Sequence, residues 1–189
     1  MSSRDLWIRA GNTTARELLA SLLATRLLMP AHSDPLYLAG PYLTDFPLLQ
    51  NHVGQFRALF LHHTEFGEQT DISFSEVLVE IATSSPVLIL TVPGENADPF
   101  VSRLRRFGSK GISIRHLEEP FHAKGLASSD FFIEGSMNFT YSGLYNRDEK
   151  ITINSRESEV GRQKIDNALL ELSRTWRSNS RAKATADTL

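Results

Sequence analysis

The sequence predicts an α/β fold in which helices cover both faces of a mixed, largely parallel sheet. The segment from Val87 to Val92 is an almost unbroken apolar run, which is typical of a buried parallel strand. Strand-like and helical patterns alternate around it, and this β-α-β-α-β order is typical of an α/β sandwich. The chain has 189 residues, of which 41% are hydrophobic and 22% charged. We therefore expect one domain with a sizeable core over residues 1–189.

Helices are expected where apolar residues recur at helical spacing after a start signal. Thr14 with Glu17 and Ser73 with Glu76 are candidate capping boxes. Asp98, followed by proline, is a candidate N-cap. The expected helices cover residues 14–29, 73–82, 98–107 and 158–176.

Strands are expected where apolar residues run together or alternate. The expected strands cover residues 36–42, 87–92, 112–114, 122–128, 131–135 and 149–154. Residues 50–66 fit either a helix or a strand. Residues 178–189 are small and polar, and we expect them to form a flexible tail.

Composition excludes several classes of protein. The net charge is −2, so any affinity for nucleic acid must come from a local patch. The absence of cysteine excludes disulfides and thiolate metal sites. The apolar run from Leu18 to Met29 contains Arg26, and we interpret it as an amphipathic helix and not as a signal peptide. No stretch approaches the roughly 18 apolar residues of a membrane span. We expect a cytoplasmic protein that does not contact a membrane.

The candidate site begins with His122 and Lys124, which would point to the same face of the strand expected at 122–128. Ser136 and Asn138 follow shortly after, beside Gly135. These residues supply an imidazole, an ammonium, a hydroxyl and a carboxamide. This set of groups suits a phosphodiester better than any other common substrate.

An enzyme that cleaves a phosphodiester without metal must supply positive charge, a nucleophile and a proton for the leaving oxygen. Neutral imidazole is a competent nucleophile near pH 7. Lys124 would neutralise nonbridging phosphate oxygens, and Asn138 and Ser136 would donate hydrogen bonds to them. A carboxylate behind the histidine would fix its tautomer. Glu149 and Glu134 are both candidates for that carboxylate.

The His-x-Lys pattern resembles the HKD signature of the phospholipase D superfamily. Residues 135–140, Gly-Ser-Met-Asn-Phe-Thr, resemble the nuclease branch of that superfamily, and Glu149 lies at the matching distance. Residues 36–45 also resemble the first strand of nuclease-type members. The resemblance implies a phospholipase D-like α/β/α sandwich and a phosphodiesterase that uses neither metal nor cofactor.

The resemblance also implies a role for each site residue. His122 would be the nucleophile and would form a phosphohistidine. Lys124 and Asn138 would bind the phosphate, with Ser136 in support. Glu149 would orient the histidine.

The aspartate of the signature is displaced in this chain. It would fall at Ser129, but the aspartate occurs one position later, at Asp130. A hairpin one residue longer explains the shift. The role of Asp130 stays open, and a structural role in the turn is favoured.

The number of motifs predicts an oligomer. Of six histidines, only His122 has a lysine two residues later. In the superfamily reaction, one histidine is phosphorylated and a second, from another such motif, protonates the leaving group. We therefore expect a twofold homodimer that shares one active site at its axis. The last strand and residues 143–146 are the expected interface neighbours.

Arg147 and Lys150 flank Glu149, and we expect them, with Tyr141, to contact the substrate. Two other groups have a simpler interpretation. The adjacent histidines His62 and His63 are not expected to bind metal, because adjacent residues of a strand point to opposite sides. The densest basic group is expected mainly as a solvated helix face, and it comprises Arg103, Arg105, Arg106 and Lys110.

These observations predict a DNA nuclease in a restriction, defence or DNA-modification context. The chain resembles most the small phospholipase D-like proteins found with 7-deazaguanine DNA-modification clusters. One alternative is a non-catalytic subunit that binds DNA or docks to a larger restriction complex. A lipid phosphodiesterase is less favoured, because the sequence shows neither an amphipathic membrane face nor a second motif.

Overall fold

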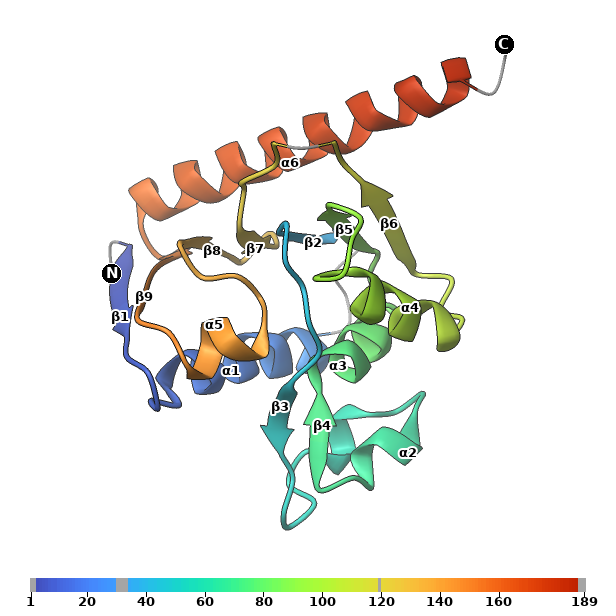
Figure 1. The fold of residues 1–189 in the computed structure, drawn as a ribbon. Helices are drawn as coiled ribbons and strands as arrows, with labels where there is room; N and C mark the ends of the chain where they lie inside the picture. The colour runs from blue at the N-terminus through green and yellow to red at the C-terminus, as the bar shows by residue number, and fades with distance from the viewer. Residues whose placement is uncertain (1–2, 30–33, 119, 187–189) are drawn as a thin grey trace.

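In the computed structural model, which describes residues 3–29, 34–118 and 120–186, a seven-stranded sheet lies between helices (Figure 1). The order of its strands is β1-β9-β8-β7-β2-β5-β6. The strands are β1 (Arg4–Ile8), β2 (Leu36–Ala39), β5 (Val87–Thr91), β6 (Ile112–His116), β7 (Gly125–Ala127), β8 (Phe131–Gly135) and β9 (Glu149–Ser155).

The sheet is mixed, as predicted, but its parallel part is smaller than expected. Strand β5 pairs in parallel with β2 and β6. The pairs β2–β7, β7–β8, β8–β9 and β9–β1 are antiparallel. A turn of three residues joins β7 to β8, and such a short connection can join only antiparallel neighbours.

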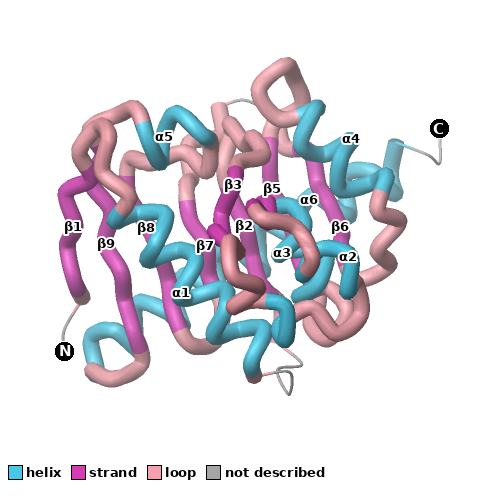
Figure 2. The backbone as a smooth tube through the Cα atoms, turned by 90° about the horizontal axis from the view of Figure 1, so that it is seen from below, coloured by secondary structure: helices cyan, strands magenta, loops and turns pink. Residues whose placement is uncertain are grey.

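Helices cover both faces of this sheet, which confirms the predicted α/β/α sandwich. Helices α1 (Thr14–Leu28), α3 (Phe74–Ile81) and α4 (Asp98–Arg106) lie on one face, and α6 (Glu159–Ala186) crosses the other (Figure 1). Figure 2 shows the first face, with α1 and α3 in front of the strands. The short helix α5 (Tyr141–Tyr145) lies at one edge of the sheet.

Two of the predicted helix starts differ from the structure. The capping box of Ser73 and Glu76 is present. At α1 the N-cap is Thr13, whose side chain caps no backbone N–H and instead donates to the Glu17 carboxylate over 2.6 Å, so the capping box predicted for Thr14 and Glu17 is wrong. At α4 the N-cap is Ala97, and Asp98 already lies within the first turn.

The ambiguous residues 50–66 form little regular structure. They hold the 3₁₀ turn η1 (Arg57–Leu59) and the start of α2 (Thr64–Gly67). They lie beside a second, two-stranded sheet of β3 (Pro47–Gln50) and β4 (Asp71–Ser73).

The carboxylate of Glu80, which is only 3% exposed, holds this region against α3. It accepts hydrogen bonds from the backbone N–H groups of Leu61, His62 and His63 over 2.9, 3.0 and 3.1 Å. The Nδ1 atoms of both histidines also lie 3.2 and 2.8 Å from its oxygens. Burial alone would raise the pKa of Glu80, but these bonds outweigh it and lower the pKa below its usual value.

Helix α6 extends beyond the expected 158–176. It continues to Ala186, so the described residues from Ser178 onward are helical, and the predicted flexibility of this tail stays a prediction. No glycine or proline follows Gly161, so nothing in the sequence stops the helix there. Within the described part of the chain, no helix has both the length and the apolar character needed to cross a bilayer.

Candidate active site

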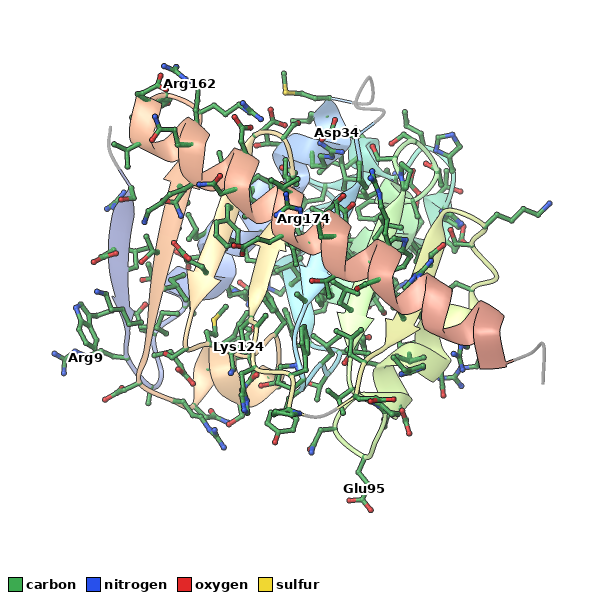
Figure 3. The ribbon with its side chains drawn as sticks, turned by 90° about the horizontal axis from the view of Figure 1, so that it is seen from above. Arg9, Asp34, Glu95, Lys124, Arg162 and Arg174 are labelled. Carbon is green, nitrogen blue, oxygen red and sulfur yellow. The ribbon has the colours of Figure 1, made fainter. Side chains whose placement is uncertain are left out.

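The candidate site lies at one edge of the main sheet. Strands β2, β5, β6 and β8 point the same way, so their carboxyl ends meet at this edge, where β7 and β9 begin. In Figure 3, Lys124 lies along this edge with Arg9 and Glu95, whereas Asp34 and Arg162 lie at the opposite edge. Active sites of open α/β sheets usually form at such carboxyl ends.

His122 and Lys124 lie in the connection before β7 and not on the strand predicted at 122–128. The ladder begins only at Gly125, because its partner on β2 is the last residue of that strand, Ala39. His122 is exposed, and among the described residues none forms a hydrogen bond with its ring. The ammonium of Lys124 donates to the His122 carbonyl over 3.3 Å. The Lys124 side chain therefore folds back onto the backbone of the loop that carries His122, and strand alternation does not set the direction of the two side chains.

Three neighbouring strand ends place the motif residues together. Gly125 pairs with Glu134, and Gly135 pairs with Ile151. Ser136 extends this ladder, since its N–H donates to the Lys150 carbonyl over 3.0 Å. Neighbouring strands are about 4.8 Å apart, so the three segments that carry the motif enter one small region.

Four of the six residues from Gly135 to Thr140 have a clear structural role. Gly135 has a φ of +151°, and a Cβ there would lie 2.2 Å from the Lys150 carbonyl oxygen. Met137 and Phe139 are buried and hold the loop in the core. The Thr140 hydroxyl accepts from the Gly143 N–H over 3.0 Å and caps α5. Between them, Ser136 is exposed and Asn138 is half-buried.

Phe139 ties this loop to the rest of the molecule. Its ring stacks against Phe74 of α3 with centroids 6.3 Å apart. Its carbonyl accepts from the Thr44 N–H over 3.1 Å, which joins it to the loop after β2. The Oδ1 atom of the preceding Asn138 is buried and has no hydrogen-bond partner among the described residues. An unpaired buried oxygen of this kind costs about 1–3 kcal/mol and is typical of functional sites.

The two candidate orienting carboxylates lie on opposite faces of the sheet. Glu149 accepts a hydrogen bond from the Ser136 hydroxyl, at the site edge. Glu134 faces α6, where its carboxylate accepts from Asn154 over 3.2 Å and from Lys164 over 3.4 Å. Glu134 is therefore engaged away from the site. The orienting role of Glu149 toward a histidine stays a prediction, since its partner in this chain is Ser136.

Asp130 lies at the other end of β7 from Lys124. Its carboxylate is 3.7 Å from the buried Arg26 guanidinium, which also contacts Asp34 at 3.3 Å. Asp34 in turn accepts from the Ser129 N–H over 3.1 Å. Burial acts to raise the pKa of Asp34, but the bonds from Ser129 and the nearby Arg26 charge lower it overall. These contacts hold the β7–β8 turn against α1.

The three candidate substrate contacts differ in what they touch. Arg147 is exposed in the turn before β9. The Lys150 ammonium is 2.8 Å from the Asp5 carboxylate, so this cation is partly engaged. Tyr141 is about half exposed and stacks on Tyr145 with ring centroids 4.6 Å apart.

Part of the basic group on α4 has a structural function. The Arg103 guanidinium bonds Asp45 at 2.8 Å, the Ser75 hydroxyl at 2.9 Å and Glu76 at 3.3 Å. Arg103 therefore links α4 to α3 and to the loop after β2. The exposed members of the group are Arg105, Arg106 and Lys110.

The anchor of the His122 loop is a contact that the sequence did not predict. Phe121, and Leu172 and Trp176 of α6, pack against one buried cluster of Ala39, Leu90 and Leu117. The Arg115 guanidinium lies 4.3 Å from the centre of the Trp176 ring. Phe121 directly precedes His122, so α6 fixes the segment that carries the histidine. Only the apolar spacing of α6 hinted at this contact.

No family model matches the chain, and no curated protein sequence matches it either. Among solved structures, Nuc from Salmonella typhimurium, a phospholipase D family member, superposes with a TM-score of 0.57 over 93% of this chain and 94% of its own, at 12% identity. The chain has a phospholipase D-like fold.

Two further solved structures superpose on the chain and support the same fold. NucT from Helicobacter pylori gives a TM-score of 0.54 at 10% identity, over 93% of this chain and 96% of its own. Phosphatidylserine synthase from Haemophilus influenzae Rd KW20 gives 0.51 at 15% identity, over 91% of this chain but 38% of its own. At these identities the likeness establishes the fold, and function must be argued from the site.

Proposed function

We propose that the chain is a metal-independent phosphodiesterase that cleaves DNA. The observation that carries this proposal is the meeting of the His122–Lys124 loop, Ser136 and Asn138, and Glu149 at three neighbouring strand ends. The phospholipase D-like fold, which Nuc and NucT share, supports it. The DNA-modification or defence context stays a prediction from the sequence resemblance.

The proposed reaction has two steps. An imidazole nitrogen of His122 attacks phosphorus, the bond from phosphorus to the leaving oxygen breaks, and a second imidazolium protonates that oxygen. Water then attacks the phosphohistidine, gives its proton to the second imidazole, and the phosphorus–nitrogen bond breaks. Lys124 and Asn138 hold the nonbridging oxygens, where the negative charge of the transition state develops. The products are a phosphomonoester and an alcohol.

The second imidazole in this proposal is His122 of a second copy of the chain. The exposure of His122 at the sheet edge supports this arrangement, because an exposed ring is open to a partner. A twofold axis beside it would bring two copies of the loop together.

Cleavage of supercoiled plasmid in EDTA tests the proposed activity. The protein should nick the plasmid, and His122→Ala and Lys124→Ala should each reduce the rate at least about a thousandfold. His116→Ala is the matched control, because His116 is also exposed at this edge but lies at the end of β6, about three strand spacings from β7. Binding of DNA without any cleavage would favour the non-catalytic alternative. Hydrolysis of phosphatidylcholine vesicles but not of DNA would favour the lipid alternative.

Mixing tests the shared site separately. If a dimer needs His122 from both chains, a tenfold excess of His122→Ala should lower the activity per wild-type chain about tenfold once subunits exchange. If each chain acts alone, the excess should have no effect. Sedimentation that shows only monomer at micromolar concentration would also contradict the dimer.

A further inference from the structure

Trp7 on the edge strand β1 is 71% exposed. Tryptophan normally buries 150–250 Å² of surface, so an indole this open stabilises the fold little. The contact that the described residues give its ring is the Lys150 ammonium, 5.8 Å from the ring centre. This ring is therefore available to a ligand.

Trp7 lies close to the candidate active site. It pairs in register with Lys150 of β9, and the Lys150 carbonyl accepts from the Ser136 N–H. Two strand spacings, about 10 Å, therefore separate Trp7 from Ser136 along the sheet. The backbone of β1 is also fixed at the site edge, because Asp148 accepts from the Ala10 N–H over 3.0 Å.

The surroundings of Trp7 are charged and not apolar. Arg9 is exposed two residues after Trp7 and Arg147 is exposed in the turn before β9, whereas Arg4 lies three residues before Trp7 and faces the other side of the strand. Asp5 anchors Lys150 beneath the ring, at 2.8 Å. No other large exposed hydrophobic residue of the described chain belongs to β1 or β9. A lone aromatic ring among charged groups of both signs suits the flat base of a nucleic acid, with Arg9 and Arg147 available to its phosphates, whereas a membrane contact needs a broader apolar surface.

We propose that Trp7 is a stacking subsite for a base of single-stranded nucleic acid whose phosphate lies at Lys124 and Asn138. The proposal rests on the phosphodiesterase function and adds to it a substrate class with unpaired bases. Lys124 directly precedes β7, three strand spacings or about 14 Å from β1, and bases of a stacked strand are about 3.4 Å apart, so the stacked base lies about four nucleotides from the scissile phosphate. Arg9 and Arg147, exposed at the site end of β1 and β9, contact the phosphate backbone.

Binding of fluorescein-labelled oligo(dT), measured by anisotropy in EDTA, tests the subsite. The measurements use a His122→Ala background, which prevents turnover. Adding Trp7→Ala should weaken oligo(dT) binding about tenfold, and Trp7→Phe should retain most of the affinity. Affinity for a blunt duplex should change less than twofold, since paired bases cannot stack on the ring. Leu61→Ala, which removes a side chain that is 75% exposed elsewhere, is the matched control and should change neither affinity.

A direct signal comes from the ring itself. The chain has two tryptophans, so Trp176→Phe leaves Trp7 as the only tryptophan. Saturating oligo(dT) should then quench the tryptophan fluorescence. An affinity for oligo(dT) that changes less than twofold in Trp7→Ala would overturn the proposal. So would loss of a dimer in Trp7→Ala, which would make the ring a contact between copies, or loss of binding to anionic vesicles alone, which would make it a membrane contact.

The two proposals fail in different ways. If the wild-type protein cleaves no nucleic acid but oligo(dT) binding still depends on Trp7, the phosphodiesterase function is wrong and the stacking subsite stands. If cleavage depends on His122 but oligo(dT) binding ignores Trp7, the subsite is wrong and the function stands.

Discussion

Gly135→Ala should damage both the fold and the site. The new Cβ would lie 2.2 Å from the Lys150 carbonyl oxygen and 2.9 Å from the Ile151 Cα. Ordinary contact requires about 3.2 Å or more, so β8 and β9 would have to separate by about 1 Å. That separation weakens the 3.0 Å bond from the Ser136 N–H to Lys150 and moves Ser136 away from the site.

The expected cost has two parts. The φ of +151° suits glycine, and forcing another residue into such a conformation costs about 1–3 kcal/mol. The clash and the weakened hydrogen bond add about 2 kcal/mol. We therefore expect Gly135→Ala to lower the free energy of unfolding by about 3–5 kcal/mol, measured by urea denaturation, and to reduce DNA cleavage at least tenfold.

Gly94→Ala is the matched control. Gly94 has a similar φ of +144°, but nothing lies within 4 Å of the Cβ position. It should carry the conformational cost alone, about 1–3 kcal/mol. Equal destabilisation by the two variants would refute the reasoning, because it would show that the close approach to Lys150 contributes nothing.

Two further predictions concern other parts of the molecule. Glu80→Gln should lower the free energy of unfolding by about 2 kcal/mol at pH 7, because an amide cannot accept all the bonds of the carboxylate. The pKa of Glu80 is lowered in the folded state, so the destabilisation caused by Glu80→Gln should be constant above pH 4.5, the usual pKa of this group. It should shrink as the pH falls below that value, and urea denaturation at several pH values would measure the change. A difference that grows toward acid would contradict this. Phe121→Ala should lower the kcat of DNA cleavage at least about tenfold with little change in KM, because it frees His122 without touching the phosphate ligands. A change confined to KM in steady-state kinetics would argue against that anchor.

Local signals in the sequence predicted the elements that depend on local interactions. The apolar run from Val87 is strand β5, and Ser73 with Glu76 caps α3 as expected. Strand β1 was missed because its charged and apolar residues carry no strong pattern, and it forms only by pairing with β9 from the far end of the chain. The length of β7 was overestimated because its partner on β2 ends at Ala39, which the sequence of β7 does not reveal.

The candidate site, like the fold, has one part that local sequence predicts and another that depends on contacts between distant residues. The motif residues lie just before β7 and just after β8, and a three-residue turn joins these two strands, so their approach is a local property. The difference between Glu149 and Glu134 depends on register. Glu134 pairs with Thr152, so it faces α6, whereas Glu149, three residues before Thr152 on the same strand, faces the other side. Local sequence patterns do not predict this register, and they do not predict that α6 packs on the His122 loop.

The most direct test of the proposed function is to trap the covalent intermediate. Rapid quenching of the protein with a short DNA substrate in EDTA, followed by peptide mass spectrometry at neutral to basic pH, should find the phosphoryl adduct on His122. The adduct should be absent from His122→Ala, which should also be inactive. Cleavage without an adduct, an adduct on another residue, or full activity in His122→Ala would contradict the proposed mechanism.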